Sequence, residues 1–292
     1  MIHNLILSMG FGLVTASVLA LAGVGVTLQF GVTNHVNFAY GSYMALAAYW
    51  AWEVNVRLGV TLWLAVLAGA ALMAVFAVVV NYLLLEPFRR RGLPVIFLLI
   101  VTMGLWLILS NAILVVWGPN TVELNIGSTS PIQIGPFLFT AQQLLIILLA
   151  MIILSAVHLL LTRSKLGKAM RAMSDDPGLA EASGINGPRI VAVTWLLTGF
   201  LMGFAGCVLA INLTSFQPTF GDDYLFVIFA AVILGGIGQP YGTMLGALLI
   251  GLATEMSAIV INPALKDDVA FLLLIVIILV RPQGLIPTRG RR

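Results

Sequence analysis

The sequence predicts an all-α integral membrane protein, a polytopic bundle of eight to nine transmembrane helices, some of them short, broken or re-entrant. Of its 292 residues 61% are hydrophobic and 9% charged, whereas soluble domains carry about 25% charged residues. Apolar stretches of about twenty residues recur along the chain, and a helix needs about that length to cross a hydrocarbon core of roughly 30 Å. We therefore expect residues 1–292 to form a single transmembrane domain.

Nine apolar runs account for the expected helices: residues 5–28, 36–52, 60–85, 94–117, 141–161, 190–211, 225–234, 244–261 and 269–280. No Lys or Arg precedes the first run, so we expect a retained helix rather than a cleaved signal peptide. The second, seventh and ninth runs are short for a full crossing. The second and seventh also adjoin Gly, Asn or Pro, which is typical of broken or re-entrant helices that are lined by protein.

Basic residues indicate which loops face the cytoplasm, because Lys and Arg concentrate in short cytoplasmic loops. Twelve of the fourteen lie in three groups: Arg89, Arg90 and Arg91; Arg163, Lys165, Lys168, Arg171 and Arg189; and Arg281, Arg289, Arg291 and Arg292. We expect all three groups, and with them the C-terminus, on the cytoplasmic side. Since the basic residues are divided among loops instead of lining one soluble face, they do not indicate a nucleic-acid partner.

The connections between these groups are expected on the outer side. Residues 118–140 and 212–223 contain no Lys or Arg and include Glu123, Asp222 and Asp223. The first connection also holds three prolines and three glycines, which favours a structured external segment over a further helix. The orientation of the N-terminus stays open, because it depends on whether residues 36–52 cross fully.

The longest inward-facing polar segment covers residues 163–189. Lys165, Lys168 and Arg171 recur every three residues, so a helix there would be amphipathic. Farther along, Asp176 suits an N-cap, Pro177 the first helical position and Gly184 a left-handed stop, which together predict an isolated two-turn helix. Such a helix could transmit force from a soluble partner or be a plain surface loop, and the residues alone do not decide between these.

Several blocks of sequence resemble one family. The run LGKAMRAMSDDPGLAEASGIN, residues 166–186, resembles the cytoplasmic loop of permease subunits from ATP-binding-cassette importers of branched-chain amino acids. Residues 34–49, NHVNFAYGSYMALAAY, resemble the family's Asn-Phe-Ala-(His)-Gly signature, with Tyr40 where the family often has His. Residues 230–252 and 266–285 match the same family in the expected order. The resemblance covers nearly the whole chain.

The resemblance implies a permease that works with partners in a bacterial cytoplasmic (inner) membrane. These partners are a second related permease, two cytoplasmic ATPase subunits that bind ATP and Mg, and an extracytoplasmic solute-binding protein. The expected substrates are branched-chain amino acids or related small polar solutes. Residues 163–189 would be the loop that couples ATP hydrolysis to transport, through Asp176, Pro177, Leu179, Ala180, Glu181, Ala182 and Gly184.

Two interruptions of the apolar pattern are candidates for the translocation path. Polar groups between long apolar segments should face a protein interior or a water-filled route, although hydrogen bonds that merely hold helices together are as plausible for any single residue. The second interruption is rich in glycine without the G-x-G-x-x-G spacing of a nucleotide-binding loop, so we expect a break between two half-helices. The candidates are Asn34, His35, Asn37, Phe38, Tyr40 and Gly41, and Gly235, Gly236 and Gly238.

The sequence gives no sign of an enzyme. It lacks the G-x-x-x-x-G-K-[ST] phosphate loop, so we expect no ATPase site and no cofactor in this chain. His3, His35 and His158 do not have the spacing of metal ligands. The alternative is a secondary transporter or channel driven by an ion gradient, which would place acidic residues inside its helices. Glu255 is the one carboxylate well within an apolar run.

Overall fold

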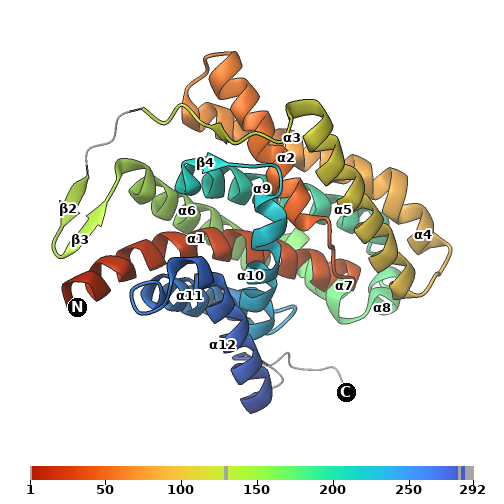
Figure 1. Cartoon of the computed structure of the whole chain (residues 1–292). Helices are drawn as coiled ribbons and strands as arrows, with labels where there is room; N and C mark the ends of the chain where they lie inside the picture. Colours follow the sequence, from red (N-terminus) through yellow and green to blue (C-terminus); the bar gives the residue numbers. More distant parts are fainter. Residues whose placement is uncertain (1, 128–130, 282–283, 287–292) are drawn as a thin grey trace. The chain divides into compact units, whose positions relative to one another are not determined.

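The computed structural model describes residues 2–127, 131–281 and 284–286, and it is mostly helical, as the sequence predicts (Figure 1). The α-helices are α1 Ile2–Thr33, α2 Tyr40–Trp52, α3 Leu62–Val80, α4 Glu86–Arg90, α5 Val95–Trp117, α6 Ala141–Arg163, α7 Lys165–Asp175, α8 Pro177–Ala182, α9 Gly187–Leu213, α10 Phe220–Gly235, α11 Pro240–Ser257 and α12 Lys266–Val280. Two π-helical turns, Glu53–Arg57 and Asn81–Leu85, follow α2 and α3, and a 3-10 turn at Pro263–Leu265 precedes α12.

Five helical stretches among the described residues are long and apolar enough to cross a membrane. They are Leu5–Thr33, Leu62–Arg90, Val95–Trp117, Ala141–Arg163 and Gly187–Leu213. The second runs without a break through α3, the π-helical turn and α4. By contrast, α2, α10 and α12 have 13, 16 and 15 residues, fewer than the roughly twenty that a full crossing needs. The multi-pass character is thus confirmed, and the total of eight to nine crossings stays a prediction.

Short strands occupy the segments that were expected outside the membrane. Strand β1 Val122–Glu123 pairs antiparallel with β4 Ser215–Phe216, and β2 Ile132–Ile134 pairs antiparallel with β3 Phe137–Phe139. The β1–β4 pair joins the two acidic connections of the sequence. Within the described part of residues 118–140 there is no helix, which confirms the structured, non-helical segment.

Contacts between backbone positions divide the chain into two compact units. The first comprises Met1–Thr27, Ile126–Leu154 and Phe226–Arg292, and the second comprises Leu28–Asn125 and Ser155–Leu225. The expectation that residues 1–292 form a single transmembrane domain stays a prediction.

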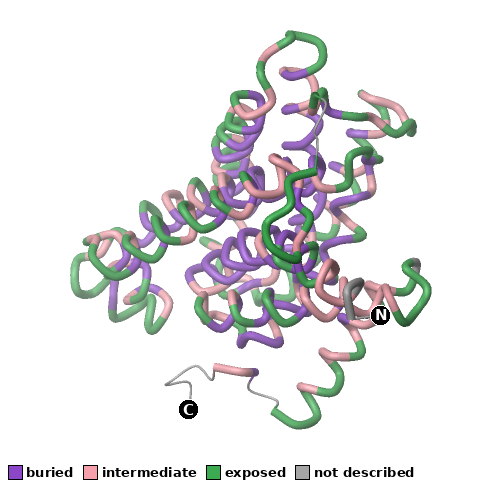
Figure 2. The backbone as a smooth tube through the Cα atoms, turned by 90° about the vertical axis from the view of Figure 1, so that its left-hand side faces the viewer, coloured by how far each residue is buried: buried purple, intermediate pink, exposed green. Residues whose placement is uncertain are grey.

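The core of the second unit is the mutual packing of α2, α3 and α9. Residues Tyr40–Tyr49 of α2 are all buried, and the buried stretches appear purple in Figure 2. Glycine lets the backbones meet, as expected where lipid offers no hydrophobic drive for helix association. A Cβ atom on Gly206 of α9 would lie 2.2 Å from the Met44 carbonyl oxygen of α2, and one on Gly203 would lie 2.8 Å from the Met73 Cβ of α3. These two glycines therefore let α9 pack directly against α2 and α3.

In the first unit, α10 and α11 pack through small residues. A Cβ on Gly235 would lie 2.2 Å from the Gly242 carbonyl oxygen, and one on Gly246 would lie 2.1 Å from the Ala231 carbonyl oxygen. The two helices are separated by a four-residue turn, since α10 ends at Gly235 and α11 begins at Pro240. The predicted break between half-helices is therefore present.

Candidate functional site

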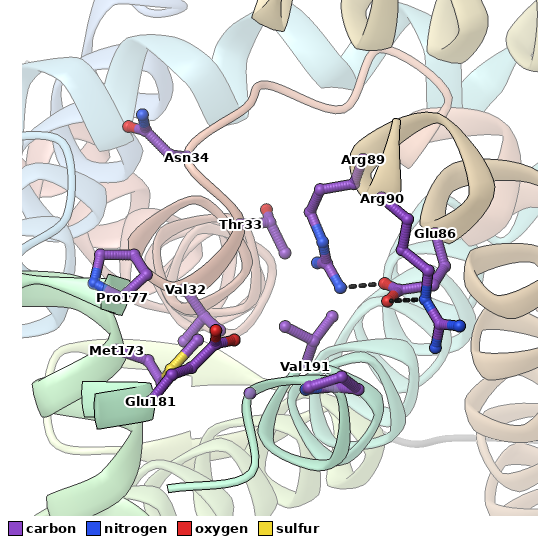
Figure 3. Close-up of a pocket in the computed structure, with 12 residues that line it drawn as sticks. Val32, Thr33, Asn34, Glu86, Arg89, Arg90, Met173, Pro177, Glu181 and Val191 are labelled. Carbon is purple, nitrogen blue, oxygen red and sulfur yellow. Dashed lines mark hydrogen bonds and ion pairs between the residues drawn. The ribbon is translucent and has the colours of Figure 1, made fainter. Parts of the chain in front are cut away.

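A cavity of about 400 Å³ lies within the second unit, where the end of α1, helix α4 and the segment from α7 to α9 converge (Figure 3). Its lining residues combine charged, polar and apolar side chains: Val32, Thr33, Asn34, Glu86, Arg89, Arg90, Met173, Pro177, Glu181, Gly187, Pro188 and Val191. The cavity thus brings Asn34 of the predicted translocation path together with Pro177 and Glu181 of the predicted coupling loop.

Helix α8 forms one wall, and its ends match the sequence prediction. The Asp176 carboxylate oxygen Oδ1 accepts a hydrogen bond from the Leu179 backbone N–H at 2.9 Å, and Pro177 occupies the first turn. Gly184 follows the helix with φ of +86°, a left-handed conformation that suits glycine. Ala180 is buried, whereas Leu179 is 67% exposed. The capped helix is confirmed, and Leu179 projects away from the unit that carries it.

Helix α4 forms the opposite wall around a buried carboxylate. Glu86 is 6% exposed, and its two oxygens accept hydrogen bonds from Arg89 and, at 2.9 Å, from Arg90 Nε. Sequence analysis used the arginines of this group to place the loop on the cytoplasmic side and did not predict that the group lines a cavity. The available signal was the spacing of the carboxylate three and four residues before the two arginines, which places all three on one helix face.

Glu181 faces the cavity from α8 and rests against the start of α9. A Cβ atom on Gly187 would lie 2.1 Å from the Glu181 carboxylate oxygen Oε1, so the absence of a side chain at position 187 makes room for the carboxylate. The positive end of the α9 helix dipole favours a carboxylate at this place. Figure 3 shows the Glu181 carboxylate and the Arg89 guanidinium on different sides of the cavity.

The end of α1 supplies a polar edge of the cavity. Asn34 has φ of +55°, a left-handed conformation that ends the helix. Asn adopts this conformation more readily than most other residues with side chains. Its backbone N–H still bonds to the Phe30 carbonyl at 2.8 Å, and the Thr33 hydroxyl donates to the Gln29 carbonyl at 2.7 Å. The last carbonyls of a helix carry partial negative charge, so this edge favours a cation.

The other residues of the first predicted path segment are buried in protein instead of lining this cavity. His35 and Asn37 are each 3% exposed, and Tyr40 is fully buried. The Asn37 side-chain oxygen accepts a hydrogen bond from the Ala39 N–H at 3.1 Å, while Asn37 Nδ2 and His35 Nε2 have no hydrogen-bond partner. Gly41 packs against α10, since a Cβ there would lie 2.3 Å from the Gly221 carbonyl oxygen.

Phe38 completes this segment. Its backbone N–H donates to the Thr102 hydroxyl of α5 at 3.4 Å. Thr102 is itself fully buried. This hydrogen bond links the segment before α2 to α5. It is an example of the bonds that hold helices together, which the sequence left open as an alternative to a role in the translocation path.

The second predicted path segment, Gly235, Gly236 and Gly238, lies in the first unit. Gly236 and Gly238 have φ of +106° and +87°. Residues with a side chain rarely adopt these backbone conformations, which explains why both positions are glycine. The Leu285 and Ile286 N–H groups bond to the Leu234 and Gly235 carbonyls at 2.9 and 3.3 Å. Two residues beyond α12 thus occupy the last two carbonyls of α10.

A second polar cluster was missed by sequence reasoning. Asp222 at the start of α10 accepts hydrogen bonds from Ser42 of α2 at 2.8 Å and from Ser110 of α5 at 2.7 Å, and the two hydroxyl oxygens lie 2.9 Å apart. The sequence placed Asp222 in an external connection. No local pattern announces the contact, because Ser42 and Ser110 are ordinary small residues within apolar runs.

Comparison with known proteins identifies the family. The profile described as "Branched-chain amino acid transport system / permease component" matches residues 8–278. The chain belongs to this family. It is similar over 94% of its length to branched-chain amino acid permeases, and the predicted resemblance is confirmed. No solved structure matches the chain at a significant level.

Three relatives illustrate the range of the family. The high-affinity branched-chain amino acid permease BraD of Pseudomonas aeruginosa is 30% identical, with 94% of this permease and 93% of BraD covered. LivH of Escherichia coli K12, with the same described role, is 28% identical over 94% of this permease and 93% of LivH. The ribose import permease RbsC of E. coli is 29% identical over 80% of this permease and 73% of RbsC.

Proposed function

We propose that this chain is the transmembrane permease subunit of an ATP-binding-cassette importer for branched-chain amino acids or related small polar solutes, with ATP hydrolysed by partner subunits. The family match over residues 8–278 carries the proposal, together with the branched-chain amino acid transport role of BraD and LivH. RbsC is described as a ribose permease, so the same scaffold accommodates different solutes. The proposed substrate class therefore follows BraD and LivH, which match this chain over nearly their whole length.

The proposed machine contains a second related permease, two cytoplasmic ATPases that bind ATP and Mg, and an extracytoplasmic solute-binding protein. It sits in the bacterial cytoplasmic (inner) membrane, with eight to nine crossings and a cytoplasmic C-terminus. The chain itself is proposed to have no ATPase site and no cofactor. In the part of the chain that the structure describes, no group of three or more His, Cys, Asp or Glu side chains could hold a metal ion.

Residues 163–189 are proposed as the cytoplasmic coupling loop. Helix α8 is rigid because Asp176 caps its start and Gly184 ends it, and its exposed Leu179 offers an apolar contact to an ATPase. Motion of the ATPases would be passed to α9, which begins at Gly187 after a turn of four residues. Asp176, Pro177, Leu179, Ala180, Glu181, Ala182 and Gly184 are the proposed coupling residues.

The translocation path is proposed along the segment that includes Asn34, His35, Asn37, Phe38, Tyr40 and Gly41, and along the break at Gly235, Gly236 and Gly238. The first segment supports this best. Buried polar atoms without partners, His35 Nε2 and Asn37 Nδ2, remain in it, and polar groups at membrane depth belong to a protein interior or an aqueous route.

The surroundings of Glu255 disfavour an ion-gradient-driven transporter. Lys266 Nζ lies 2.9 Å from Glu255 Oε1, and the Thr15 hydroxyl donates to the same oxygen at 3.1 Å. A carboxylate that carries an ion must release and rebind it, whereas a fixed ammonium group already neutralises this one. Glu255 is therefore proposed as a structural group that joins α11 to α12 and α1.

Reconstitution of the complete complex in proteoliposomes tests the proposal. Radiolabelled leucine uptake should require the solute-binding protein on one side and ATP on the other. Leu179→Ser and Gly184→Val should lower leucine uptake per ATP hydrolysed, because the first removes the apolar contact and the second strains the end of α8. Ser183→Ala, at an exposed position of the same segment, is the control. Unchanged coupling in both variants would contradict the coupling role, and ATP-independent leucine uptake would contradict the importer.

A further inference from the structure

We propose that the cavity between α4 and α8 binds a free zwitterionic amino acid with a branched aliphatic side chain, taken up from the cytoplasmic solution. The inference rests on the proposed function for the side of the membrane that the cavity faces. It adds a cell-side binding site to a permease whose solute otherwise arrives from outside. Charge, polarity, apolar lining and size support it separately.

The two charged walls carry opposite net charge. On the α4 wall one carboxylate, Glu86, faces two guanidinium groups, Arg89 and Arg90, so one positive charge is left over. The Arg89 side chain is 29% exposed, which leaves N–H donors for a ligand carboxylate, and a guanidinium has five N–H donors in all. On the α8 wall Glu181 supplies one negative charge. A zwitterion carries the complementary pair.

The ends of helices strengthen this polarity. The C-terminal end of α1 lines the cavity at Thr33 and Asn34, and the negative end of its helix dipole favours an ammonium group there. Glu181 can accept a hydrogen bond from the same ammonium. The ligand ammonium is therefore assigned to Glu181 and the end of α1, and the ligand carboxylate to Arg89 and Arg90.

Apolar side chains line the space between the charged walls. Val32, Met173 and Val191 come from α1, α7 and α9, and Figure 3 shows them among the charged residues. Met is adaptable in shape, and the two valines match a branched alkyl group. The volume of about 400 Å³ lies at the lower end of the roughly 300–1,000 Å³ of small-molecule sites, which suits a single amino acid.

Ligands of one charge fit less well. An inorganic anion attracted to Arg89 would face the Glu181 carboxylate, and a cation attracted to Glu181 would face the arginines. Neither would use the apolar lining. A zwitterion satisfies both walls at once, so its affinity should depend on both of its charges.

Binding of leucine to the nucleotide-free membrane complex in nanodiscs, without the solute-binding protein, tests the site. Leucine should compete with radiolabelled leucine better than 4-methylpentanoate, which lacks the ammonium group, or 3-methylbutylamine, which lacks the carboxylate. Glu181→Gln should weaken leucine binding about tenfold, the effect of about 1.4 kcal/mol, and should not weaken binding of 4-methylpentanoate, whose carboxylate no longer faces a negative charge. A variant that merely damaged the fold would weaken both ligands together.

Gly187→Ala provides a second variant that keeps every charge. Its Cβ would meet the Glu181 carboxylate and the Met173 methyl group, both flexible ends of side chains, so the carboxylate should move while the backbone stays in place. Leucine binding should fall as in Glu181→Gln. Asp175→Asn is the matched control, because it removes an exposed carboxylate of the same segment that does not line the cavity.

Each outcome has one meaning. Equal leucine affinity in the unaltered complex, Glu181→Gln and Gly187→Ala would overturn the site, even where leucine uptake proceeds normally. Competition by inorganic phosphate as strong as by leucine would overturn the zwitterion assignment. Leucine binding with the expected variant pattern in a complex that does not import leucine would support the site and count against the proposed function alone.

Discussion

Asp222 shows how one carboxylate can join three helices. It accepts hydrogen bonds from Ser42 of α2 and Ser110 of α5 while standing in the first turn of α10. Removing it takes away the acceptor that both hydroxyl groups share, so at least one of them loses its partner, and an unsatisfied buried polar group costs about 1–3 kcal/mol. The hydrogen bonds of Asp222 therefore stabilise the packing of α2, α5 and α10.

We expect Asp222→Ala to destabilise the protein by about 1–3 kcal/mol. The measurement is the thermal unfolding midpoint of the detergent-solubilised protein. Asp223→Ala is the control, because Asp223 is the next residue of the same helix turn and is exposed. Equal loss in both variants would mean that negative charge at the start of α10, and not the link between helices, is what matters.

Close glycine contacts offer a second test at the residue scale. In Gly206→Ala the new Cβ would lie 2.2 Å from the Met44 carbonyl oxygen, and backbone atoms cannot rotate away, so we expect a loss of about 1–3 kcal/mol. Gly104→Ala in α5, where nothing lies within 4 Å of the new atom, should be neutral or stabilising by roughly 0.5–1 kcal/mol. Comparison of the thermal unfolding midpoints of the two variants checks this prediction. Equal stability of Gly206→Ala and Gly104→Ala would contradict the close contact at Gly206.

Individual residues could be predicted only where the signal is local. Asp176, Pro177 and Gly184 were placed correctly because caps and turns depend on a few neighbouring residues. The partners of Asp222 lie in segments far apart in the sequence. The contact of Glu181 with Gly187 depends on how α8 folds back against α9. No local sequence pattern predicts either contact.

At the scale of elements, apolar runs located every long helix but not its ends. Helix α1 extends to Thr33, beyond the apolar run that ends at residue 28, and α2 begins only at Tyr40 instead of residue 36. The π-helical turn Glu53–Arg57 was not predicted. Its Asn55 is buried, donates to the Val60 carbonyl at 2.8 Å and accepts from the Asn125 N–H at 2.7 Å, so tertiary contacts decide the backbone there.

The cap of α8 gives a prediction for an element. Asp176→Ala removes the acceptor of the Leu179 N–H, which costs a helix about 1 kcal/mol, and α8 has six residues with little else to hold its start. We expect faster protease cleavage within residues 175–184. Asp176→Asn keeps a capping oxygen and should cleave at the original rate, whereas equally fast cleavage of both variants would exclude the cap as the cause.

At the scale of the whole molecule, composition was sufficient for the class of protein and the resemblance for the family, because both draw on hundreds of residues at once. The cavity could not be foreseen in the same way. Its walls come from α1, α4 and α7–α9, and only the folded chain brings these segments together.

The energy source gives a prediction for the assembled protein. Since Lys266 already neutralises Glu255, leucine uptake by proteoliposomes supplied with ATP should continue unchanged when ionophores collapse the proton and sodium gradients. The control is omission of ATP, which should abolish uptake. Loss of uptake with ionophores while ATP hydrolysis continues would favour the gradient-driven alternative.

Backbone contact between helices has a mechanical consequence. Gly199, Gly203 and Gly206 hold α9 directly against α3 and α2, without long side chains that could bend to absorb a displacement. Helix α9 has 27 residues and so spans about 40 Å, with the turn after α8 at one end and Thr214 and β4 at the other. A displacement of α8 that reaches the start of α9 should therefore be transmitted to the far end of α9 with little loss, because the helix moves as a rigid body.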